Sequence, residues 1–258
     1  MLKRLFWDIE TSPNICLSWR IGYKINIDHD NLLKERAIIC IGYKWQDEPS
    51  AKIICWDKAQ DDKAMLKEFL VIANEADEMV AHNGDSFDLP WIKTRCIFHG
   101  LPCDPLIKTV DTLQWARRKF LFNSNKMDYI AKFLGLGGKI KTEFGLWKEV
   151  IKGDPAALKR MMEYCRKDVE LLEQVWERME KQVRHKTHAG VMSGLDKWTC
   201  PSCASEKIRV GRGHRVTAAG TVQHQMQCQD CGRSYSINSK AHSDYLEAKK
   251  PKKGKIHQ

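Results

Sequence analysis

The chain has 258 residues, of which 43% are hydrophobic, and a formal net charge of +10. This is enough for one large domain, or for a domain of ordinary size with a small appendage. No apolar run reaches the roughly 18 residues of a membrane span, and Lys3, Arg4, Asp8 and Glu10 interrupt any run of signal-peptide length. We therefore expect a soluble, cytoplasmic protein without a membrane partner, whose ten cysteines are reduced thiols or metal ligands.

The excess positive charge is confined to the last third of the chain. Residues 1–177 carry 27 basic and 27 acidic side chains, whereas residues 178–258 carry 16 basic and 6 acidic ones. A basic segment beside a neutral domain is typical of a protein that binds a polyanion, usually nucleic acid. The alternative is a solubilising tail, which the terminal KKPKKGK would fit equally well.

The order of the predicted elements indicates an α/β domain. Apolar runs and alternation predict strands over 2–9, 36–45, 51–56, 78–83 and 107–113. Helical spacing of apolar residues predicts helices over 61–76, 89–100, 125–138 and 154–182. Asp154 followed by Pro155 is a favourable start for the last of these helices. Three consecutive strands followed by alternating helices and strands predict a mixed sheet flanked by helices.

The first strand contains two acidic residues, Asp8 and Glu10, within the apolar stretch LFWDIE. Side chains alternate along a strand, so residues two apart emerge on the same face. Two neighbouring carboxylates repel each other and resist burial unless a positive charge lies between them. A solvated sheet edge is the alternative, because a second Asp-x-Glu occurs at Asp168 and Glu170 in a helical stretch.

Further acidic residues follow at two later places. Asp88, in NGDSFD, comes where a loop after a strand enters a helix, although Asp88 or Asp85 could simply cap that helix. Tyr164 and Asp168, in YCRKD, are spaced i and i+4 and share one helix face. The alternative there is a surface aspartate beside a half-buried tyrosine.

Taken together, the three motifs DIET, NGDSFD and YCRKD resemble those of the proofreading-type 3′→5′ exonucleases, in the order and approximate spacing of that superfamily. The superfamily has four metal-binding carboxylates on a ribonuclease H-like fold, and the tyrosine marks one of its subgroups. The NGDSFDLPW stretch is most similar to the exonuclease domain of family B DNA polymerases. The resemblance covers about residues 1–180.

The resemblance implies two Mg²⁺ or Mn²⁺ ions held by Asp8, Glu10, Asp88 and Asp168, with Asp8 bridging both. Such a metal pair activates water and stabilises the leaving 3′ oxygen. Tyr164 would orient the attacking water, since a phenol with a pKa near 10 is a poor base at neutral pH. The remaining residues matched to the family lie near the terminal nucleotide: Thr11, Asn83 and Phe87. Asp111 we interpret as structural, because four acids already suffice.

The C-terminal third contains two Cys-x-x-Cys pairs, Cys200 with Cys203 and Cys228 with Cys231. Two such pairs can close one tetrahedral, structural Zn²⁺ site. The stretches MQC and SYSI are strand-like, and the spacer between the pairs is basic, as expected of a small β-rich zinc ribbon with a hairpin suited to phosphate contact. Two unrelated redox pairs are the alternative.

These patterns predict four segments: a ribonuclease H-like exonuclease domain over 1–182, a linker over 183–196, a zinc ribbon over 197–240 and a disordered basic tail over 241–258. The expected function is metal-dependent removal of nucleotides from the 3′ end of DNA by a standalone enzyme. Its zinc ribbon would hold single-stranded or 3′-ended substrate, or a replication or repair protein. The alternatives are an RNA exonuclease, a structure-specific nuclease on the same fold, or a non-catalytic nucleic-acid-binding adaptor.

Overall fold

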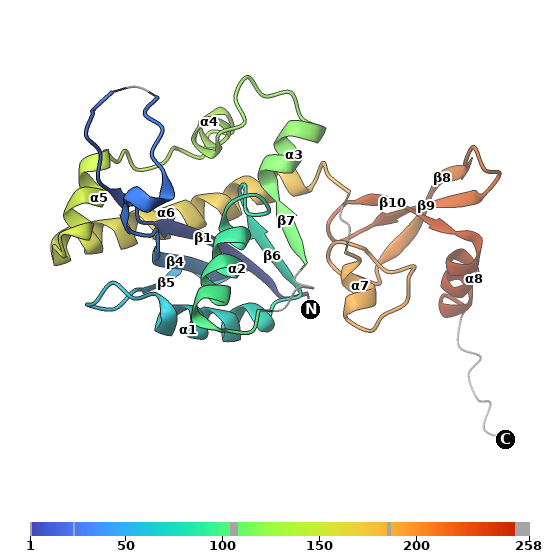
Figure 1. The fold of residues 1–258 in the computed structure, drawn as a ribbon. Helices are drawn as coiled ribbons and strands as arrows, with labels where there is room; N and C mark the ends of the chain where they lie inside the picture. The colour runs from blue at the N-terminus through green and yellow to red at the C-terminus, as the bar shows by residue number, and fades with distance from the viewer. Residues whose placement is uncertain (1, 23, 104–107, 185–186, 251–258) are drawn as a thin grey trace. The chain divides into compact units, whose positions relative to one another are not determined.

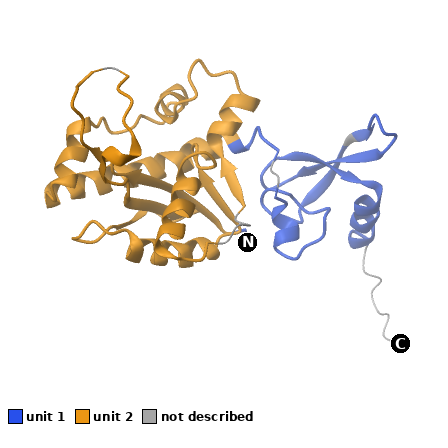
Figure 2. Cartoon of the chain, in the orientation of Figure 1, with its two compact units in different colours: residues 1–2, 180–258 blue, residues 3–179 orange. Residues whose placement is uncertain are grey.

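The computed structural model describes residues 2–22, 24–103, 108–184 and 187–250. The chain divides into two compact units, residues 3–179 and residues 1–2 with 180–258 (Figure 2). Within the described residues, no helix has the length and apolar character needed to cross a membrane.

The larger unit is built on a five-stranded mixed sheet in the order β5-β4-β1-β6-β7 (Figure 1). The central strand β1 runs antiparallel to β4 and parallel to β6. The five strands are β1 (Arg4–Thr11), β4 (Ile38–Trp45), β5 (Lys52–Cys55), β6 (Glu78–Ala81) and β7 (Thr109–Asp111). All five predicted strands are therefore present, with no end shifted by more than two residues; residue 107 of the last prediction lies outside the described residues.

Among the described residues, six α-helices accompany this sheet: α1 (Lys63–Asn74), α2 (Asp88–His99), α3 (Thr112–Lys119), α4 (Met127–Phe133), α5 (Phe144–Ile151) and α6 (Pro155–Glu180). Four of them were predicted, and α6 begins after Asp154, whose Oδ1 accepts a hydrogen bond from the N–H of Ala156 at 3.0 Å. The sequence did not predict α3 and α5. Each has only eight residues and buries two or three side chains, too few for a clear apolar period.

Alternation along β1 separates its two faces. Leu5, Trp7 and Ile9 belong to the core cluster that α1 and α2 complete. Phe6 points to the other face, where its ring meets that of Trp176 of α6 at 5.3 Å. Because the side-chain period of a strand is two, the side chains that follow Phe6 on this face are the two acidic residues of β1.

A glycine lets α6 approach the sheet closely at this point. Gly42 of β4 pairs with Asp8 of β1. A Cβ at position 42 would lie 2.9 Å from both Cys165 Sγ and Val169 Cγ2 of α6, closer than van der Waals contact permits. The absent side chain therefore allows the middle of α6 to pack directly over β1 and β4.

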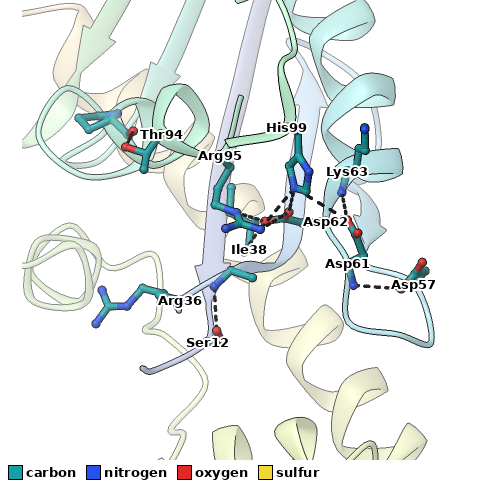
Figure 3. A network of polar contacts seen from close by, with 12 residues as sticks. Ser12, Arg36, Ile38, Asp57, Asp61, Asp62, Lys63, Thr94, Arg95 and His99 are labelled. Carbon is teal, nitrogen blue, oxygen red and sulfur yellow. Dashed lines mark hydrogen bonds and ion pairs between the residues drawn. The ribbon is translucent and has the colours of Figure 1, made fainter. Parts of the chain in front are cut away.

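A buried carboxylate, that of Asp62, joins three elements of the larger unit (Figure 3). Asp62, which precedes α1, is fully buried and accepts a hydrogen bond from the N–H of Ile38 at 2.9 Å. Arg95 of α2 donates to both of its oxygens, at 2.7 and 2.8 Å. His99 Nε2 lies 2.6 Å from Oδ1. This network fixes α1, α2 and the start of β4 to one another.

Between β1 and β4 the chain forms a separate two-stranded sheet from β2 (Ile15–Cys16) and β3 (Leu32–Lys34). A 3₁₀ turn, η1 (His29–Asn31), comes directly before β3. The segment between the two strands exposes large apolar side chains, including Trp19 and Ile21. This feature was not predicted from the sequence.

The smaller unit contains a three-stranded antiparallel sheet in the order β10-β9-β8. Its elements are α7 (Ala189–Met192), β8 (Ile208–Val216), β9 (Val222–Cys228), β10 (Ser234–Asn238) and α8 (Ser239–Ala248). Trp198, Met226 and Tyr245 belong to its core. The expected small β-rich unit is present, and the basic spacer does form a hairpin, β8–β9.

Two of the segment predictions need correction. The stretch expected as a disordered tail from 241 onward instead begins inside α8, where Ala241 and Tyr245 are buried in the core and Asn238 caps the helix through the N–H of Ala241. Residues 251–258 lie outside the described residues. The expected linker contains α7 and the buried Val183, and it belongs to the smaller unit apart from the undescribed residues 185–186.

Candidate active site

Three of the four predicted metal ligands converge at the centre of the larger unit. Carboxylate oxygens of Asp8, Glu10 and Asp168 all lie within 4.8 Å of one another. The first two come from one face of β1, and the third comes from α6. The packing of Cys165 Sγ at 3.7 Å from the Asp8 carbonyl oxygen holds the helix over the strand. Strand alternation and helix packing together therefore bring distant acidic residues into one cluster.

The fourth predicted ligand, Asp88, lies beside this cluster but is not one of the three. It is buried at the first turn of α2, and its Oδ1 accepts a hydrogen bond from the N–H of Ile9 at 3.1 Å. The helix N-cap is Phe87, so Asp88 is the first residue of α2 and not its N-cap. Its carboxylate is near enough to raise the pKa of Asp8. The structure thus ties Asp88 to β1 and not to a helix cap.

Burial makes these carboxylates difficult to ionise together. It raises the pKa of Asp8 well above its usual value, and the charges of Asp88 and Glu10 raise it further. Burial, with the charge of Asp168, raises the pKa of Glu10 to about 8. Burial also raises the pKa of Asp88 to about 7. These carboxylates can therefore all be ionised at neutral pH only if a cation lies close to them.

The cation supplied by the protein itself is Lys139, which the sequence analysis did not identify. Its Nζ lies 2.5 Å from Asp168 Oδ2, and it lies 5.6 Å from the centre of the Tyr164 ring. Its backbone N–H donates to Asp128 Oδ1 at 2.9 Å, which fixes the loop before α5. Burial alone would lower the pKa of Lys139, but Asp168 and Asp8 outweigh it and raise the pKa above its usual value. The signal in the sequence was the lysine after the Gly-Gly pair that ends the predicted helix over 125–138.

The cluster also has unused capacity for a ligand. Asp168 Oδ1 is buried and has no hydrogen-bond partner among the described residues, although such atoms are nearly always paired. Hard divalent cations such as Mg²⁺ take carboxylate oxygens as ligands. The donor set and the orphaned oxygen therefore fit a divalent metal ion better than they fit a purely structural role.

Tyr164 lies on the face of α6 that carries Asp168, one turn before it. Its ring contacts Trp147 edge-on at 6.4 Å. Trp147 Nε1 in turn donates to the Thr11 carbonyl oxygen at 3.2 Å, so Thr11 and Tyr164 are linked through one side chain. Burial raises the pKa of Tyr164 above its usual value, so its hydroxyl is protonated at neutral pH.

Asn83 and Phe87 lie in the loop between β6 and α2. Asn83 adopts a left-handed backbone conformation with φ of 77°, which is uncommon for a residue other than glycine. Its N–H donates to Asp111 Oδ1 at 2.9 Å. Asp111 also accepts from the N–H of Leu113 at 2.8 Å and caps α3. The structural interpretation of Asp111 is therefore confirmed: it shapes the loop that carries Asn83.

The four cysteines of the smaller unit form a second candidate metal site. The Sγ atoms of Cys200 and Cys231 lie 3.5 Å apart, and those of Cys203 and Cys228 lie 3.6 Å apart. A tetrahedral zinc ion with Zn–S bonds of about 2.3 Å requires sulfur atoms separated by roughly 3.8 Å. Burial raises the pKa of Cys200 to about 11, whereas N–H donors of Cys231 and Asp230 help lower the pKa of Cys228 to about 7 against the effect of burial. The geometry and the chemistry fit one four-coordinate zinc.

The group of Asp61, Asp62 and His99 also brings three donor side chains together, but it does not fit a metal. Both oxygens of Asp62 are taken by the Arg95 guanidinium, whose positive charge would repel a cation. We interpret this group as part of the structural network of Figure 3.

The fold and the acidic cluster define a ribonuclease H-like α/β domain. A family model described as the RNase_H superfamily matches residues 25–180, and the chain belongs to this superfamily.

Individual proteins show the same likeness over shorter stretches. A DNA polymerase of Pyrococcus glycovorans is 38% identical over 68 residues, which cover 22% of this chain and 8% of the polymerase. A DNA polymerase of Thermococcus kodakarensis is 33% identical over 72 residues, covering 24% of this chain and 4% of the polymerase. The chain spans less than a tenth of either relative.

Among solved structures, the family B DNA polymerase from the hyperthermophilic archaeon Pyrobaculum calidifontis is similar, with a TM-score of 0.53 and 18% identity. The alignment covers 70% of this chain and 25% of that one. At this identity the likeness shows the shared fold alone. It agrees with the expected ribonuclease H-like class.

Proposed function

We propose that this protein is a metal-dependent 3′→5′ exonuclease that removes nucleotides from the 3′ end of DNA. The observation that carries the proposal is the convergence of Asp8, Glu10 and Asp168, together with a buried Asp168 oxygen that has no hydrogen-bond partner among the described residues. Membership of the RNase_H superfamily and the local similarity to DNA polymerases support nuclease activity.

In this proposal Asp8, Glu10, Asp88 and Asp168 hold two Mg²⁺ or Mn²⁺ ions. When bound, such ions supply a water nucleophile at neutral pH and charge that neutralises the leaving oxygen. Tyr164 orients the attacking water through its protonated hydroxyl. Thr11, Asn83 and Phe87 contact the terminal nucleotide. Lys139 balances the carboxylates when no metal is bound, because its ammonium lies among them.

The four cysteines hold one structural zinc that keeps the smaller unit folded, since a closed tetrahedral site leaves no open position for catalysis. The basic smaller unit holds the substrate, or alternatively a replication or repair protein. The charge excess of residues 178–258 supports the first of these roles.

One observation favours a second candidate, a nucleic-acid-binding protein without catalysis. The Lys139 ammonium neutralises part of the acidic cluster in the absence of metal, so the cluster does not strictly need one. Digestion separates the two candidates. Single- and double-stranded DNA and RNA, each labelled at the 5′ end, are incubated with the full chain and Mg²⁺, Mn²⁺ or Ca²⁺.

A ladder of products shortened from the 3′ end, formed with Mg²⁺ or Mn²⁺, is the expected result, with DNA cut faster than RNA. Binding without any cleavage would favour the adaptor. Preferential cutting of RNA would keep the chemistry and change the substrate, a distinction that depends on the shape of the pocket around the 2′ hydroxyl.

A further inference from the structure

The smaller unit contains a large cavity that the proposed catalytic chemistry does not use. Its volume is about 850 Å³, within the range of pockets that hold a nucleotide-sized ligand. One wall is formed by residues 181–184, 187 and 188, and the other by residues 232–238. Lys197 and Arg215 complete the rim from elsewhere in the same unit.

The charge of this cavity has one sign. Its ionisable lining consists of His188 and five basic residues, which are Lys181, Arg184, Lys197, Arg215 and Arg233. Within the described part of the chain, no acidic side chain lines it. Arg233 is committed to structure, because it donates to the Val183 carbonyl oxygen at 2.7 Å and to Glu180 Oε2 at 2.8 Å. That interaction occupies Arg233 and leaves four other cations among the residues that line the cavity.

These four cations have no counterion in the described structure. All four side chains are exposed, and none of them forms an ion pair with a described residue: Lys181, Arg184, Lys197 and Arg215. Elsewhere in this unit a basic residue does find an acidic partner, as Lys207 does with Asp230 at 3.3 Å. Basic side chains left unpaired around a concave surface favour an anionic ligand.

The uncharged lining indicates which anion fits. Ser234, Ser236 and Gln223 contribute hydroxyl and amide groups, and a half-buried tyrosine, Tyr235, lines the same cavity. The hydroxyl of Tyr235 is tied to the Trp198 carbonyl oxygen at 2.5 Å, which fixes the ring. The Tyr235 ring packs against the core of the smaller unit and holds this wall in place. A groove that combines cations with hydroxyl and amide donors is suited to tracking the phosphate backbone of single-stranded nucleic acid.

We propose that this cavity is a second nucleic-acid site, which binds the phosphate backbone of a single strand through residues of the smaller unit alone. This proposal assigns the substrate affinity of the proposed exonuclease to named residues of the smaller unit. That the bound strand is a substrate rests on the proposed function. That the cavity binds a strand does not rest on it, because the catalytic residues do not line the cavity.

Binding is measured by fluorescence anisotropy with an end-labelled oligothymidylate of roughly 15 nucleotides. The full chain carries Asp8→Ala so that the strand is not cut. In this background, the cavity variant Lys197→Glu with Arg215→Glu is compared with a control, Lys240→Glu with Lys250→Glu. The control changes the charge equally in the same unit, and neither residue lines the cavity.

At moderate salt the cavity variant should bind the oligonucleotide at least about 10-fold more weakly. The slope of log affinity against log salt concentration should become shallower by about 1.4, because each of the two lost phosphate contacts contributes about 0.7. The control should keep most of the affinity and slope. Equal losses in both variants would overturn the assignment to the cavity. So would tighter binding of a polyglutamate peptide than of the oligonucleotide, which would indicate a protein partner instead.

Zinc content and the thermal transition of each variant establish that it is folded, and Lys197→Gln with Arg215→Gln replaces any charge-reversal variant that is not. Cleavage by the unmodified chain is measured separately. Cavity-dependent binding without cleavage would refute the exonuclease while leaving this site in place. Cleavage by a protein whose binding does not depend on the cavity would support the exonuclease and refute this second site.

Discussion

Lys139 Nζ and Asp168 Oδ2 lie 2.5 Å apart at the centre of the acidic cluster, and both side chains are largely removed from solvent. A lysine from a loop thus occupies the position where the charge of the carboxylates requires a cation. The same relationship predicts competition, because a divalent metal ion would satisfy the oxygens that this lysine now contacts.

The first prediction concerns this competition. Lys139→Met should destabilise the metal-free protein by about 1–3 kcal/mol, since it leaves buried carboxylates without a counterion and the lysine is only partly exposed. It should also tighten Mn²⁺ binding by roughly 10-fold, because a competing positive charge is gone. Chemical denaturation and titration calorimetry measure the two effects, with Lys141→Met in the same loop as the control. Weaker Mn²⁺ binding in Lys139→Met would mean that the lysine supports the metal site instead of competing with it.

The second prediction concerns Tyr164. If its hydroxyl only positions water, Tyr164→Phe should slow cleavage by about 10- to 10⁴-fold, the range of such contributions. Mn²⁺ affinity should not change, because the hydroxyl is not a metal ligand. Single-turnover rates measure the effect on the chemical step. Tyr129→Phe, whose ring stacks on Phe133, provides the matched control. An unchanged rate in Tyr164→Phe, with chemistry rate-limiting, would refute the role.

The third prediction is a dependence of stability on pH. Burial alone would raise the pKa of Asp62, but hydrogen bonds from Arg95, Ile38 and His99 together lower it below its usual value. A carboxyl with a lowered pKa stabilises the fold above its usual pKa, near 3.9. That contribution is lost as the pH falls through the lower, folded-state value.

At pH 7, Asp62→Asn should therefore cost about 3–5 kcal/mol, because it breaks a buried ion pair. Below about pH 4 the difference from the unmodified protein should shrink. Urea unfolding across this pH range tests both statements. Asp61→Asn, at the exposed neighbouring position, should change stability much less. A constant cost of Asp62→Asn at all pH values would contradict the assigned ion pair.

The sequence predicted the parts of the fold that have strong periodic patterns. The sheet order depends on β1, β4 and β6, whose apolar runs are unambiguous, and α6 has a long apolar stripe with a clear start at Asp154. The short helices were missed because their positions are set by tertiary contacts. For example, α3 is placed by the cap at Asp111, which equally holds the loop of Asn83.

The same distinction applies to the site. Two carboxylates on one strand face follow from alternation alone, so the proximity of Asp8 and Glu10 was predictable. The approach of Asp168 depends on Gly42, which has no side chain to keep α6 away from β1, and no local pattern reveals that contact. Lys139 lies in an irregular loop, where its direction is fixed by the Asp128 hydrogen bond and not by any period. The exact placement of Asp88 likewise depends on its bond to the N–H of Ile9.

The fourth prediction concerns the cysteine cluster. Cys203→Ser should abolish stoichiometric zinc binding and unfold the smaller unit, because metal binding and folding are coupled in such small sites. The larger unit should keep its own thermal transition. Metal analysis by mass spectrometry and differential scanning calorimetry measure the two effects. Cys16→Ser, outside the cluster, should retain one zinc per chain. A zinc-free unmodified protein that is nonetheless fully folded would rule out the structural role.

The central claim is that the buried carboxylates perform phosphodiester hydrolysis with bound metal. It is tested most directly by digestion of a 5′-labelled DNA strand with Mg²⁺, using Asp88→Asn and Asp8→Asn beside Asp85→Asn. Asp85 lies in the loop just before α2 and is exposed, so the same change there leaves the cluster intact. We expect Asp85→Asn to shorten the strand from its 3′ end like the unmodified protein, whereas Asp8→Asn and Asp88→Asn should lose at least about 10²-fold in rate. Equal rates in all three variants, or no product from the unmodified protein with either Mg²⁺ or Mn²⁺, would contradict the central claim.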